Sequence, residues 1–376
     1  MDKRISILHV VQSAGYGVTV YVESLIKNLP KNQFQQALLA SEYYDNDYYK
    51  SLVDRLTTIK MDRNITVNDF KTILRCRKIV LKEKPDILYC HSAKAGIYGR
   101  IAAIGTGIKV VYNPHGWAFN MHCNKLKRLF YMIIEIIFSF FTDKIIAISN
   151  FEKESTPGLI PRKKIVSVLN GIDIDRDIML LQNSEITRAV LGIDENDFVI
   201  GLIARISRQK GQDLLVRAAK DIIRHIPNCI FLLVGGKSDD IPIEKIIEEN
   251  ELKKYFIITG EVNNAIQYAN LFDIAVLTSR WEGFGLVLPE YMLAKCPIVA
   301  FDVDAVSEIV KNGCQGILVD AENIRQLSEA IIKLYKNKNL RNLMGENGYL
   351  KAINEFNIKR VCKEHELLFK SLCPNK

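Results

Sequence analysis

The sequence lacks the features that assign many chains to a class at a glance. None of its eight cysteines forms a C-x-x-C pair, no apolar run reaches the ~20 residues of a membrane-spanning helix, and no G-x-G-x-x-G follows the first predicted strand. We therefore expect reduced thiols in a cytoplasmic protein, no metal site built from cysteines, and no NAD-dependent dehydrogenase. The sequence also contains no internal repeat and no low-complexity tract.

Apolar runs are short, and one of the longest, LFYMIIEIIFSFF at 129–141, contains Glu135. Its length predicts a buried helix rather than a membrane span. The basic stretch KLKR at 125–128 precedes it. This stretch is either a solvated helix start or a contact with anionic lipid, and the sequence leaves both possibilities open.

Length and composition indicate a globular protein of two domains. The chain has 376 residues, of which 48% are hydrophobic and 25% are charged. The net charge of +8 is uneven, because residues 1–170 carry +11 and residues 171–376 carry −3. The first half is therefore expected to meet an anionic partner. Nucleic acid is not expected, since no known binding motif and no alternation of aromatic and basic residues is present.

Short apolar, β-branched runs alternate with amphipathic segments of helix length, which predicts α/β domains with parallel sheets covered on both faces. A polar, turn-rich segment at 169–180 marks the domain boundary. We predict two doubly wound domains, residues 1–170 and 171–355, followed by a C-terminal helix at 356–376. The predicted strands are RISILHVV, DILYCHS, KVVYNPH, KIIAIS and KIVSVLN in the first half and FVIGLIA, CIFLLVGG, YFIITG, DIAVLTS, PIVAFD and GILVD in the second.

Charged side chains follow two predicted strands of the second half. Arg205 and Lys210 come after FVIGLIA, and Glu282 comes after DIAVLTS. Because ligands bind beyond the carboxyl ends of parallel strands, both groups can face one crevice. A guanidinium and an ammonium together supply the donors and the charge that a diphosphate requires. Either residue alone would more often be a solvated helix start.

The stretch after Glu282 reads as a glycine turn that opens a helix. Gly283 and Gly285 allow the backbone to bend and to approach a ligand closely. Proline is tolerated in the first turn of a helix, so Pro289 predicts a helix start at about 286–288. Glu290 then lies near the helix entrance, where its carboxylate can accept hydrogen bonds from a vicinal diol such as a ribose.

The first half places comparable residues after its own strands. Gly15 and Gly17 follow the first strand, Lys94 and Arg100 follow DILYC, and His115 follows KVVYNP. A histidine at a strand end is compatible with a site, although a single histidine is more often structural. The acid-rich strings DND at 45–47 and DIDRD at 173–177 are predicted to lie in loops away from the crevice, without metal.

These pieces together resemble the retaining glycosyltransferases of family 4. The resemblance rests on the N-terminal glycine turn, HSAKAGIYGRIAA, the HGW segment, LNGID, the Arg205-x4-Lys210-Gly211 element, and above all the E-x7-E spacing of Glu282 and Glu290. It spans nearly the whole chain and implies the GT-B fold, in which two Rossmann-like domains face each other across a cleft. HSAKAG together with HGWAF is most similar to the branch that builds bacterial capsule, exopolysaccharide or O-antigen.

The resemblance implies a role for each matching residue. Arg205 and Lys210 would hold the donor diphosphate, Glu290 the ribose, and Glu282 the sugar. His115 would lie beside the sugar, and with Arg205, Lys210 and Glu282 it forms the expected catalytic set. The remaining expected donor contacts are Gly15, Gly17, Gly283, Phe284, Gly285 and Leu286, and the expected acceptor contacts are Lys94, Arg100 and Trp117.

The implied reaction is transfer of a sugar from a UDP-sugar to a saccharide on a polyprenyl diphosphate, with retention and without a metal or other cofactor. No general base is evident, which favours front-face substitution over Glu282 as a covalent nucleophile. The basic first domain, through Lys94, Arg100 and 125–128, would contact an anionic membrane surface peripherally. Two alternatives stay open, a nucleotide-sugar epimerase of the same architecture and a non-catalytic binding module.

Two positions depart from the family's pattern. Lys295 stands where a glycine is common, and Asp304-Ala305-Val306-Ser307-Glu308 stands where the family has Gly-Gly ahead of Val-Pro-Glu. The first departure is expected to alter only a helix end. The second puts the detail of the donor contacts in that loop in question.

Overall fold

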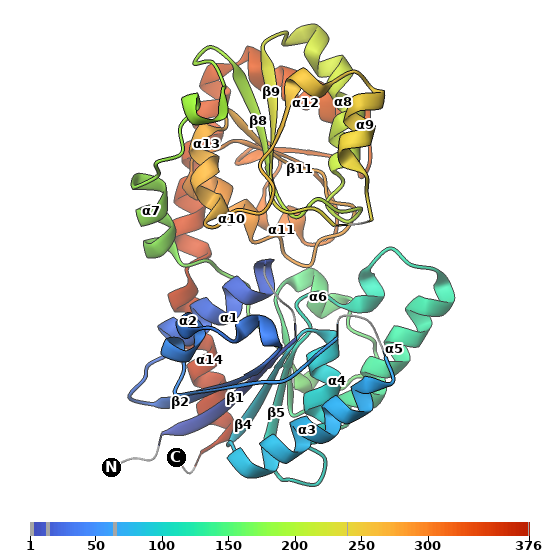
Figure 1. The fold of residues 1–376 in the computed structure, drawn as a ribbon, viewed down its shortest axis with the longest axis vertical. Coiled ribbons are helices and arrows are strands. Elements are labelled where there is room, and N and C mark those ends of the chain that lie inside the picture. The colour runs from blue at the N-terminus through green and yellow to red at the C-terminus, as the bar shows by residue number, and fades with distance from the viewer. Residues whose placement is uncertain (1–3, 13–15, 63–65, 239, 375) are drawn as a thin grey trace. The chain divides into compact units, whose positions relative to one another are not determined.

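The computed structural model describes residues 4–12, 16–62, 66–238, 240–374 and 376 (Figure 1). The chain divides into two compact units, unit 1 (Met1–Asn170 and Ile358–Lys376) and unit 2 (Gly171–Asn357). The change of unit after residue 170 falls at the predicted boundary. The C-terminal helix belongs to unit 1 from residue 358 onward, two residues later than the predicted start of that segment.

Unit 1 is built on a parallel seven-stranded sheet in the order β3-β2-β1-β4-β5-β6-β7. Its central strands are buried along nearly their whole length, as expected for a sheet covered on both faces. The strands are β1 (Ile5–Val11), β2 (Phe34–Ala40), β3 (Arg55–Thr58), β4 (Ile87–His91), β5 (Lys109–Asn113), β6 (Lys144–Ala147) and β7 (Ile165–Ser167).

Five of these strands were predicted, whereas β2 and β3 were not. β2 has the sequence FQQALLA, in which two glutamines interrupt the apolar run. β3, with the sequence RLTT, is a four-residue edge strand whose residues are all at least partly exposed. An edge strand contributes little to the core, so its sequence carries only a weak periodic signal.

Helices flank the sheet of unit 1, and α14, the red helix in Figure 1, packs against α1. The Tyr21 hydroxyl of α1 lies 3.1 Å from Nε2 of His365 in α14, which links the two helices. The helices are α1 (Tyr16–Asn28), α2 (Asp47–Leu52), α3 (Asn68–Glu83), α4 (Ala93–Ala102), α5 (Lys125–Ser139), α6 (Asn150–Glu154) and α14 (Ile358–Leu372).

The prediction that the helix at 129–141 is buried is wrong. α5 does form there, but its buried residues are Glu135 and Ser139. Glu135 faces inward because Arg100 donates to its carboxylate at 2.8 Å and the hydroxyl of Tyr112 donates at 3.0 Å. Most of the large apolar side chains of this segment therefore remain on the outside or are only partly covered. In the described part of the chain no helix is both long and apolar enough to cross a membrane.

Unit 2 contains a parallel six-stranded sheet in the order β10-β9-β8-β11-β12-β13. The chain winds outward from β8 in one direction and then returns to β11 to wind in the other. The switch point of the sheet therefore lies between β8 and β11. The strands are β8 (Phe198–Ile203), β9 (Cys229–Val234), β10 (Phe256–Ile258), β11 (Ile274–Leu277), β12 (Ile298–Phe301) and β13 (Gly316–Val319), all within the predicted runs.

The helices of unit 2 begin and end where local chemistry predicts. Asn323 and Asn337 cap α12 and α13 by accepting from backbone N–H groups three residues ahead. The start of α10 at Val287 lies within the range that Pro289 predicts. The helices are α7 (Ile174–Gln182), α8 (Gln212–His225), α9 (Ile243–Glu249), α10 (Val287–Leu293), α11 (Val306–Ile309), α12 (Ile324–Lys336) and α13 (Lys338–Glu355).

Lys295 follows the C-cap of α10 in the left-handed region, with φ of +56°. A glycine would adopt this conformation without steric cost, which explains why that residue is common at a helix end. Here the Lys295 ammonium pairs with Glu346 at 2.7 Å and lies over the ring of Tyr349. The departure is therefore confined to the helix end, as expected. Both units have the doubly wound parallel sheets of the predicted α/β class, so the fold prediction is confirmed.

Candidate active site

An ion pair joins the two predicted charged groups of unit 2. Nζ of Lys210 lies 2.6 Å from Oε2 of Glu282, and the hydroxyl of Ser279 donates to the same oxygen at 3.0 Å. Lys210 follows β8 and Glu282 follows β11, so the pair stands at the switch point of the sheet. The side chains are 19% and 8% exposed, which leaves the ammonium partly accessible. An ammonium has three donors, and the ion pair uses one of them.

Gly211 explains why the β8 loop can approach β11 so closely. It caps α8 with φ of +66°, and a Cβ built on it would lie 2.1 Å from the carbonyl oxygen of Thr278. The hydroxyl of Thr278 donates to the carbonyl of Lys210 at 2.9 Å. Any larger residue at position 211 would push the two loops apart. The glycine therefore positions Lys210 beside Glu282.

Three further contacts hold the loop that carries Glu282. The carboxylate of Asp304, in the segment that departs from the family's glycines, accepts from the backbone N–H of Glu282 at 2.7 Å. Arg280 forms an ion pair with Asp213 of α8 at 2.6 Å and with Glu322 at 3.1 Å. The Arg280 side chain therefore holds this loop against α8. Asp304 itself has φ of +48°, so it occupies a backbone conformation that a glycine adopts easily.

The glycine turn after Glu282 has the expected form. Gly285 has φ of +85°, and a Cβ on it would lie 3.1 Å from the Glu282 side chain. Phe284 is buried and packs edge-on against Phe356 at 5.9 Å between ring centroids. Leu286 occupies the N-cap position of α10, and Gly283 is half-buried. The Phe284 side chain is thus part of the core of unit 2.

Glu290 lies among charged residues that the sequence analysis did not connect with it. Arg176 and Asp177 of α7 form an ion pair in which Nε and Oδ1 are 2.8 Å apart, and α7 packs against α10. Burial and the nearby Asp177 carboxylate raise the pKa of Glu290 to about 8, against the opposing charge of Arg176. The prediction that 173–177 forms a loop away from the site is therefore wrong for 174–177. The helical spacing of the apolar residues in IDRDIMLLQ could have predicted α7.

Arg205 is half-buried, two residues after the end of β8. The backbone carbonyl of Arg205 accepts a hydrogen bond from the side-chain Nε2 of Gln212 at 3.2 Å. The side-chain Oε1 of Gln212 accepts from the backbone N–H of Ser207, also at 3.2 Å. Gln212 thus fixes the turn between Arg205 and Lys210. A buried glutamine at the start of α8 was not among the predicted site residues.

His115 follows β5 in unit 1 and stands at one end of a row of histidines. Its Nε2 lies 3.1 Å from Nδ1 of His91, and Nε2 of His91 lies 3.1 Å from Nδ1 of His9. β1 carries His9 and β4 ends at His91, so the row crosses the switch point of the unit 1 sheet. Gly17 is an exposed residue in the first turn of α1, and Gly15 lies outside the described residues.

Two of the three predicted acceptor contacts are buried in unit 1 and cannot serve as free surface groups. Arg100 is fully buried, with its guanidinium paired to Glu135 and stacked 4.0 Å from the ring centroid of Tyr112. Trp117 is 1% exposed, and its indole N–H donates to the carbonyl of Glu152 at 2.9 Å. The predictions for Arg100 and Trp117 are therefore wrong, because the unit 1 core needs both side chains.

Lys94 is held in the same region. Its ammonium pairs with Asp69 at 3.1 Å and also donates to the carbonyl of Asp62, and the side chain is 14% exposed. The positive charge is therefore largely compensated within unit 1. The Lys94 ammonium is therefore not available as a free cation for an anionic surface.

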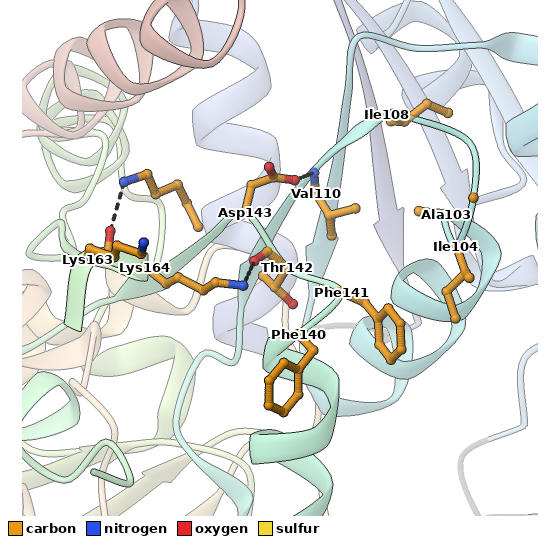
Figure 2. A pocket seen from close by; sticks show the side chains of 12 residues that line it. Ala103, Ile104, Ile108, Val110, Phe140, Phe141, Thr142, Asp143, Lys163 and Lys164 are labelled. Carbon is orange, nitrogen blue, oxygen red and sulfur yellow. Dashed lines mark hydrogen bonds between the residues drawn. The ribbon is translucent and has the colours of Figure 1, made fainter. Parts of the chain in front are cut away.

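A cavity of about 550 Å³ lies elsewhere in unit 1 (Figure 2). It is lined by residues that precede β5, β6 and β7, among them Ile108, Phe140, Phe141 and Lys164. Figure 2 shows the Lys164 ammonium donating to the carbonyl of Thr142, at 2.8 Å. The cavity thus belongs to the amino ends of the strands, whereas His115 follows a carboxyl end. No cluster of three or more side chains suited to a metal ion occurs in the described ranges.

Comparisons with known proteins match both halves of the chain. The family model described as Glycosyltransferase Family 4 matches residues 16–176, and the model described as Glycosyl transferases group 1 matches residues 183–351. The chain is 31% identical over 349 residues to the UDP-Gal:alpha-D-GlcNAc-diphosphoundecaprenol alpha-1,3-galactosyltransferase of Escherichia coli, and the match covers 90% of each protein. It is 27% identical to the capsular polysaccharide biosynthesis glycosyltransferase CapM of Staphylococcus aureus, over 83% of each protein.

Solved structures share the same architecture over the whole chain. Sucrose-phosphate synthase from Thermosynechococcus elongatus superposes with a TM-score of 0.83 at 18% identity, covering 99% of this chain and 100% of that one. HepE from Anabaena, in complex with UDP and glucose, gives a TM-score of 0.81 at 21% identity, covering 98% of this chain and 100% of that one. At these identities the likeness establishes the fold.

Proposed function

The chain belongs to the family 4 glycosyltransferases and has the GT-B fold, and we propose that it moves a hexose from a UDP-sugar to a saccharide on a polyprenyl diphosphate, with retention, in bacterial surface polysaccharide synthesis. The observation that carries the proposal is the match to the E. coli galactosyltransferase, because it covers 90% of each protein and includes both units. The name of that enzyme specifies a UDP-sugar donor and a lipid-diphosphate acceptor.

In this proposal the switch point of unit 2 binds the donor. Arg205 and Lys210 neutralise the diphosphate as it leaves, and this electrostatic effect replaces the need for a metal. Glu282 orients the Lys210 ammonium through their 2.6 Å ion pair and accepts from a sugar hydroxyl. Glu290 binds the ribose, and the backbone of residues 283–286 contacts the sugar and phosphate. Support comes from the position of these groups after β8 and β11, where doubly wound sheets bind nucleotides.

Retention is proposed to follow from front-face substitution. The bond from the anomeric carbon to the diphosphate oxygen breaks, the acceptor oxygen bonds to that carbon on the same face, and the leaving oxygen takes the acceptor proton. Such a route needs no enzyme carboxylate as a nucleophile. It suits Glu282, whose Oε2 is already engaged by Lys210 and Ser279.

The membrane contact is proposed to run through α5 instead of Lys94 and Arg100. Apolar side chains recur along one exposed face of this helix and just beyond its end, namely Leu126, Leu129, Phe130, Ile133, Ile137, Phe140 and Phe141. Lys125, Lys127 and Arg128 lie in its first turn. An exposed apolar stripe next to basic residues fits the headgroup region of an anionic leaflet, where a lipid-linked acceptor resides. Glu135 stays inside unit 1 and so does not oppose insertion.

The proposal is tested by incubating the protein with UDP-galactose and a polyprenyl-diphosphate-linked GlcNAc, then with other UDP-sugars. We expect one radiolabelled sugar to transfer to the lipid fraction, and NMR of the product to show the anomeric configuration of the donor. An epimer released from the donor without an acceptor would identify the alternative epimerase instead. Absence of both transfer and donor-induced thermal stabilisation across a panel of nucleotide-sugars would overturn the donor site.

A further inference from the structure

The row of histidines in unit 1 forms a chain of hydrogen bonds with a fixed direction. His9, His91 and His115 are connected by nitrogen to nitrogen distances of 3.1 Å, and neighbouring rings are close to parallel at interplanar angles of 17° and 26°. At the inner end, Nε2 of His9 lies 3.3 Å from Oε1 of Gln36 in β2. Gln36 is 3% exposed, and His9 and His91 are fully buried. In such a chain, the tautomer of one neutral ring determines the tautomer of the next ring.

The amide of Gln36 is oriented by a helix end. Its Nε2 donates to the carbonyl of Ile26 at 2.9 Å. In an α-helix that carbonyl would accept from the N–H of residue 30, but Pro30 has none. The Ile26 carbonyl therefore needs a side-chain donor. This need fixes the amide nitrogen of Gln36 on Ile26 and presents its oxygen to His9.

The orientation of the Gln36 amide then determines the donor and acceptor nitrogens of each histidine in turn. Burial lowers the pKa of His9 to about 4 and that of His115 to about 3, and it lowers the pKa of His91 as well, so all three rings are neutral near pH 7. A neutral imidazole has one donor and one acceptor nitrogen. The Gln36 oxygen accepts, so Nε2 of His9 carries its proton and Nδ1 of His9 accepts from Nε2 of His91. By the same rule Nδ1 of His91 accepts from Nε2 of His115.

We propose that Gln36, acting through His9 and His91, sets His115 as a hydrogen-bond acceptor at Nδ1 for a substrate hydroxyl. Within the described residues the structure gives Nδ1 of His115 no hydrogen-bond partner. The backbone at His115 has φ of +53° and is held by a 2.9 Å bond from its N–H to the side chain of Asn113. This positioning role rests on the proposed function, which supplies the hydroxyl-bearing substrate.

The same chain cannot conduct a proton away from the substrate. A proton received at Nδ1 of His115 could move from ring to ring, but an amide oxygen at the far end does not take it up. Gln36 and the two inner histidines are therefore positioning residues, and only His115 would touch substrate. Gln36 is therefore expected to control which nitrogen of His115 accepts a hydrogen bond, and not the release of a proton from the substrate.

Selective ¹⁵N labelling of histidine and long-range NMR correlation test the proposal in the full-length protein without substrate. We expect His9, His91 and His115 to be neutral at pH 7 with the proton on Nε2. His365 is an internal reference of opposite polarity, because its Nδ1 lies 2.8 Å from the carbonyl of Val361 and must donate to it. A proton on Nδ1 of His115, or a charged His115 at pH 7, would overturn the assignment.

Variants of Gln36 test control from a distance. Gln36→Leu leaves the His9 Nε2 proton without an acceptor, so we expect signals from the reversed tautomers at all three rings and a threefold to tenfold lower kcat/KM, on the order of one hydrogen bond. Gln36→Glu restores both, since a neutral carboxylic acid can donate to Ile26 and accept from His9. Tyr49→Phe, which removes a partly buried 2.6 Å hydrogen bond to Glu23 in the same unit, is the control with unchanged tautomers.

These outcomes separate the two proposals. Unchanged tautomers in Gln36→Leu would overturn the control by Gln36 even if transfer activity were found. Should Gln36→Leu fail to fold, the wild-type tautomers and the Gln36→Glu spectrum still decide the direction of the chain. Expected tautomers with no transfer from any nucleotide-sugar would count against the proposed function, while the direction of the row would stand.

Discussion

Lys210 and Glu282 are 72 residues apart in sequence, yet their side chains form an ion pair of 2.6 Å at the switch point of the unit 2 sheet. The two residues come from loops after adjacent strands, and Gly211 allows those loops to touch. The two side chains are only partly exposed, so their charges are partly shielded from bulk water.

Lys210→Met and Glu282→Gln should each lower kcat/KM for sugar transfer by about 10²-fold to 10³-fold, the usual effect of losing a preorganised electrostatic contact. The double variant should lose less than the product of the single losses, since each change already disrupts the pair. Steady-state kinetics and circular dichroism would measure this. Glu329→Gln, which breaks a surface pair with Arg325 on α12, is the matched control. Full activity of Glu282→Gln would refute the assigned role.

Donor binding should depend on pH through Glu290. Burial and Asp177 raise the pKa of this carboxyl to about 8, and only its ionised form accepts two hydrogen bonds from a ribose. We expect the affinity for UDP, measured by calorimetry, to increase from pH 7 to pH 9 in the wild type. Glu290→Gln should bind more weakly at pH 9 and show a smaller dependence. An equal pH slope in both proteins would contradict the role of Glu290.

The same shift affects folding stability with a definite sign. A carboxyl whose pKa is higher in the folded than in the unfolded protein holds a proton that unfolding releases, so its stabilising contribution is present at low pH and is lost as pH rises through about 8. Urea unfolding should show a decline in the free energy of unfolding between pH 5 and pH 8 that is shallower in Glu290→Gln. Asp177, with a pKa of about 6, titrates in the same window, and Asp177→Asn separates its share.

Arg100 should matter for stability and leave acceptor binding untouched. Its pairing with Glu135 is almost fully buried, so Arg100→Met leaves an uncompensated carboxylate and should cost about 3–5 kcal/mol of unfolding free energy. Arg100→Met combined with Glu135→Leu should recover part of that loss. Arg325→Met, on the exposed pair with Glu329, should change stability little. A purified Arg100→Met protein of wild-type stability but raised KM for acceptor would contradict this reading.

The exposed face of α5 should bind anionic vesicles. Leu129→Ser and Phe130→Ser should reduce sedimentation with phosphatidylglycerol vesicles, and Lys127→Gln should reduce it most at low salt. Leu350→Ser is a matched control, because Leu350 and Leu129 are both 54% exposed and Leu350 lies in unit 2. A concentration-dependent dimer that dissociates on Leu129→Ser, without vesicle binding, would instead identify a second copy of the chain as the occupant.

Much of the fold follows from local patterns in the sequence. Apolar β-branched runs predict eleven of the strands, and Pro289 predicts the start of α10, because strand and helix formation depend on neighbouring residues. The strands β2 and β3 were missed because glutamines interrupt one and the other is a polar edge strand. Residues after strand ends also indicated Arg205, Lys210, Glu282 and His115, since carboxyl ends share one edge of a parallel sheet.

The sequence by itself thus determined the fold class, the family, and the position of Arg205, Lys210 and Glu282 after the ends of their strands. Only the tertiary structure decided which side chains meet, because pairing depends on strand order and register, which periodicity does not encode. The sequence places Glu135 inside an apolar helix but does not explain its burial. The structure explains it by the ion pair with Arg100. The direction of the row from Gln36 to His115 likewise depends on β1, β2, β4 and the end of β5 lying side by side.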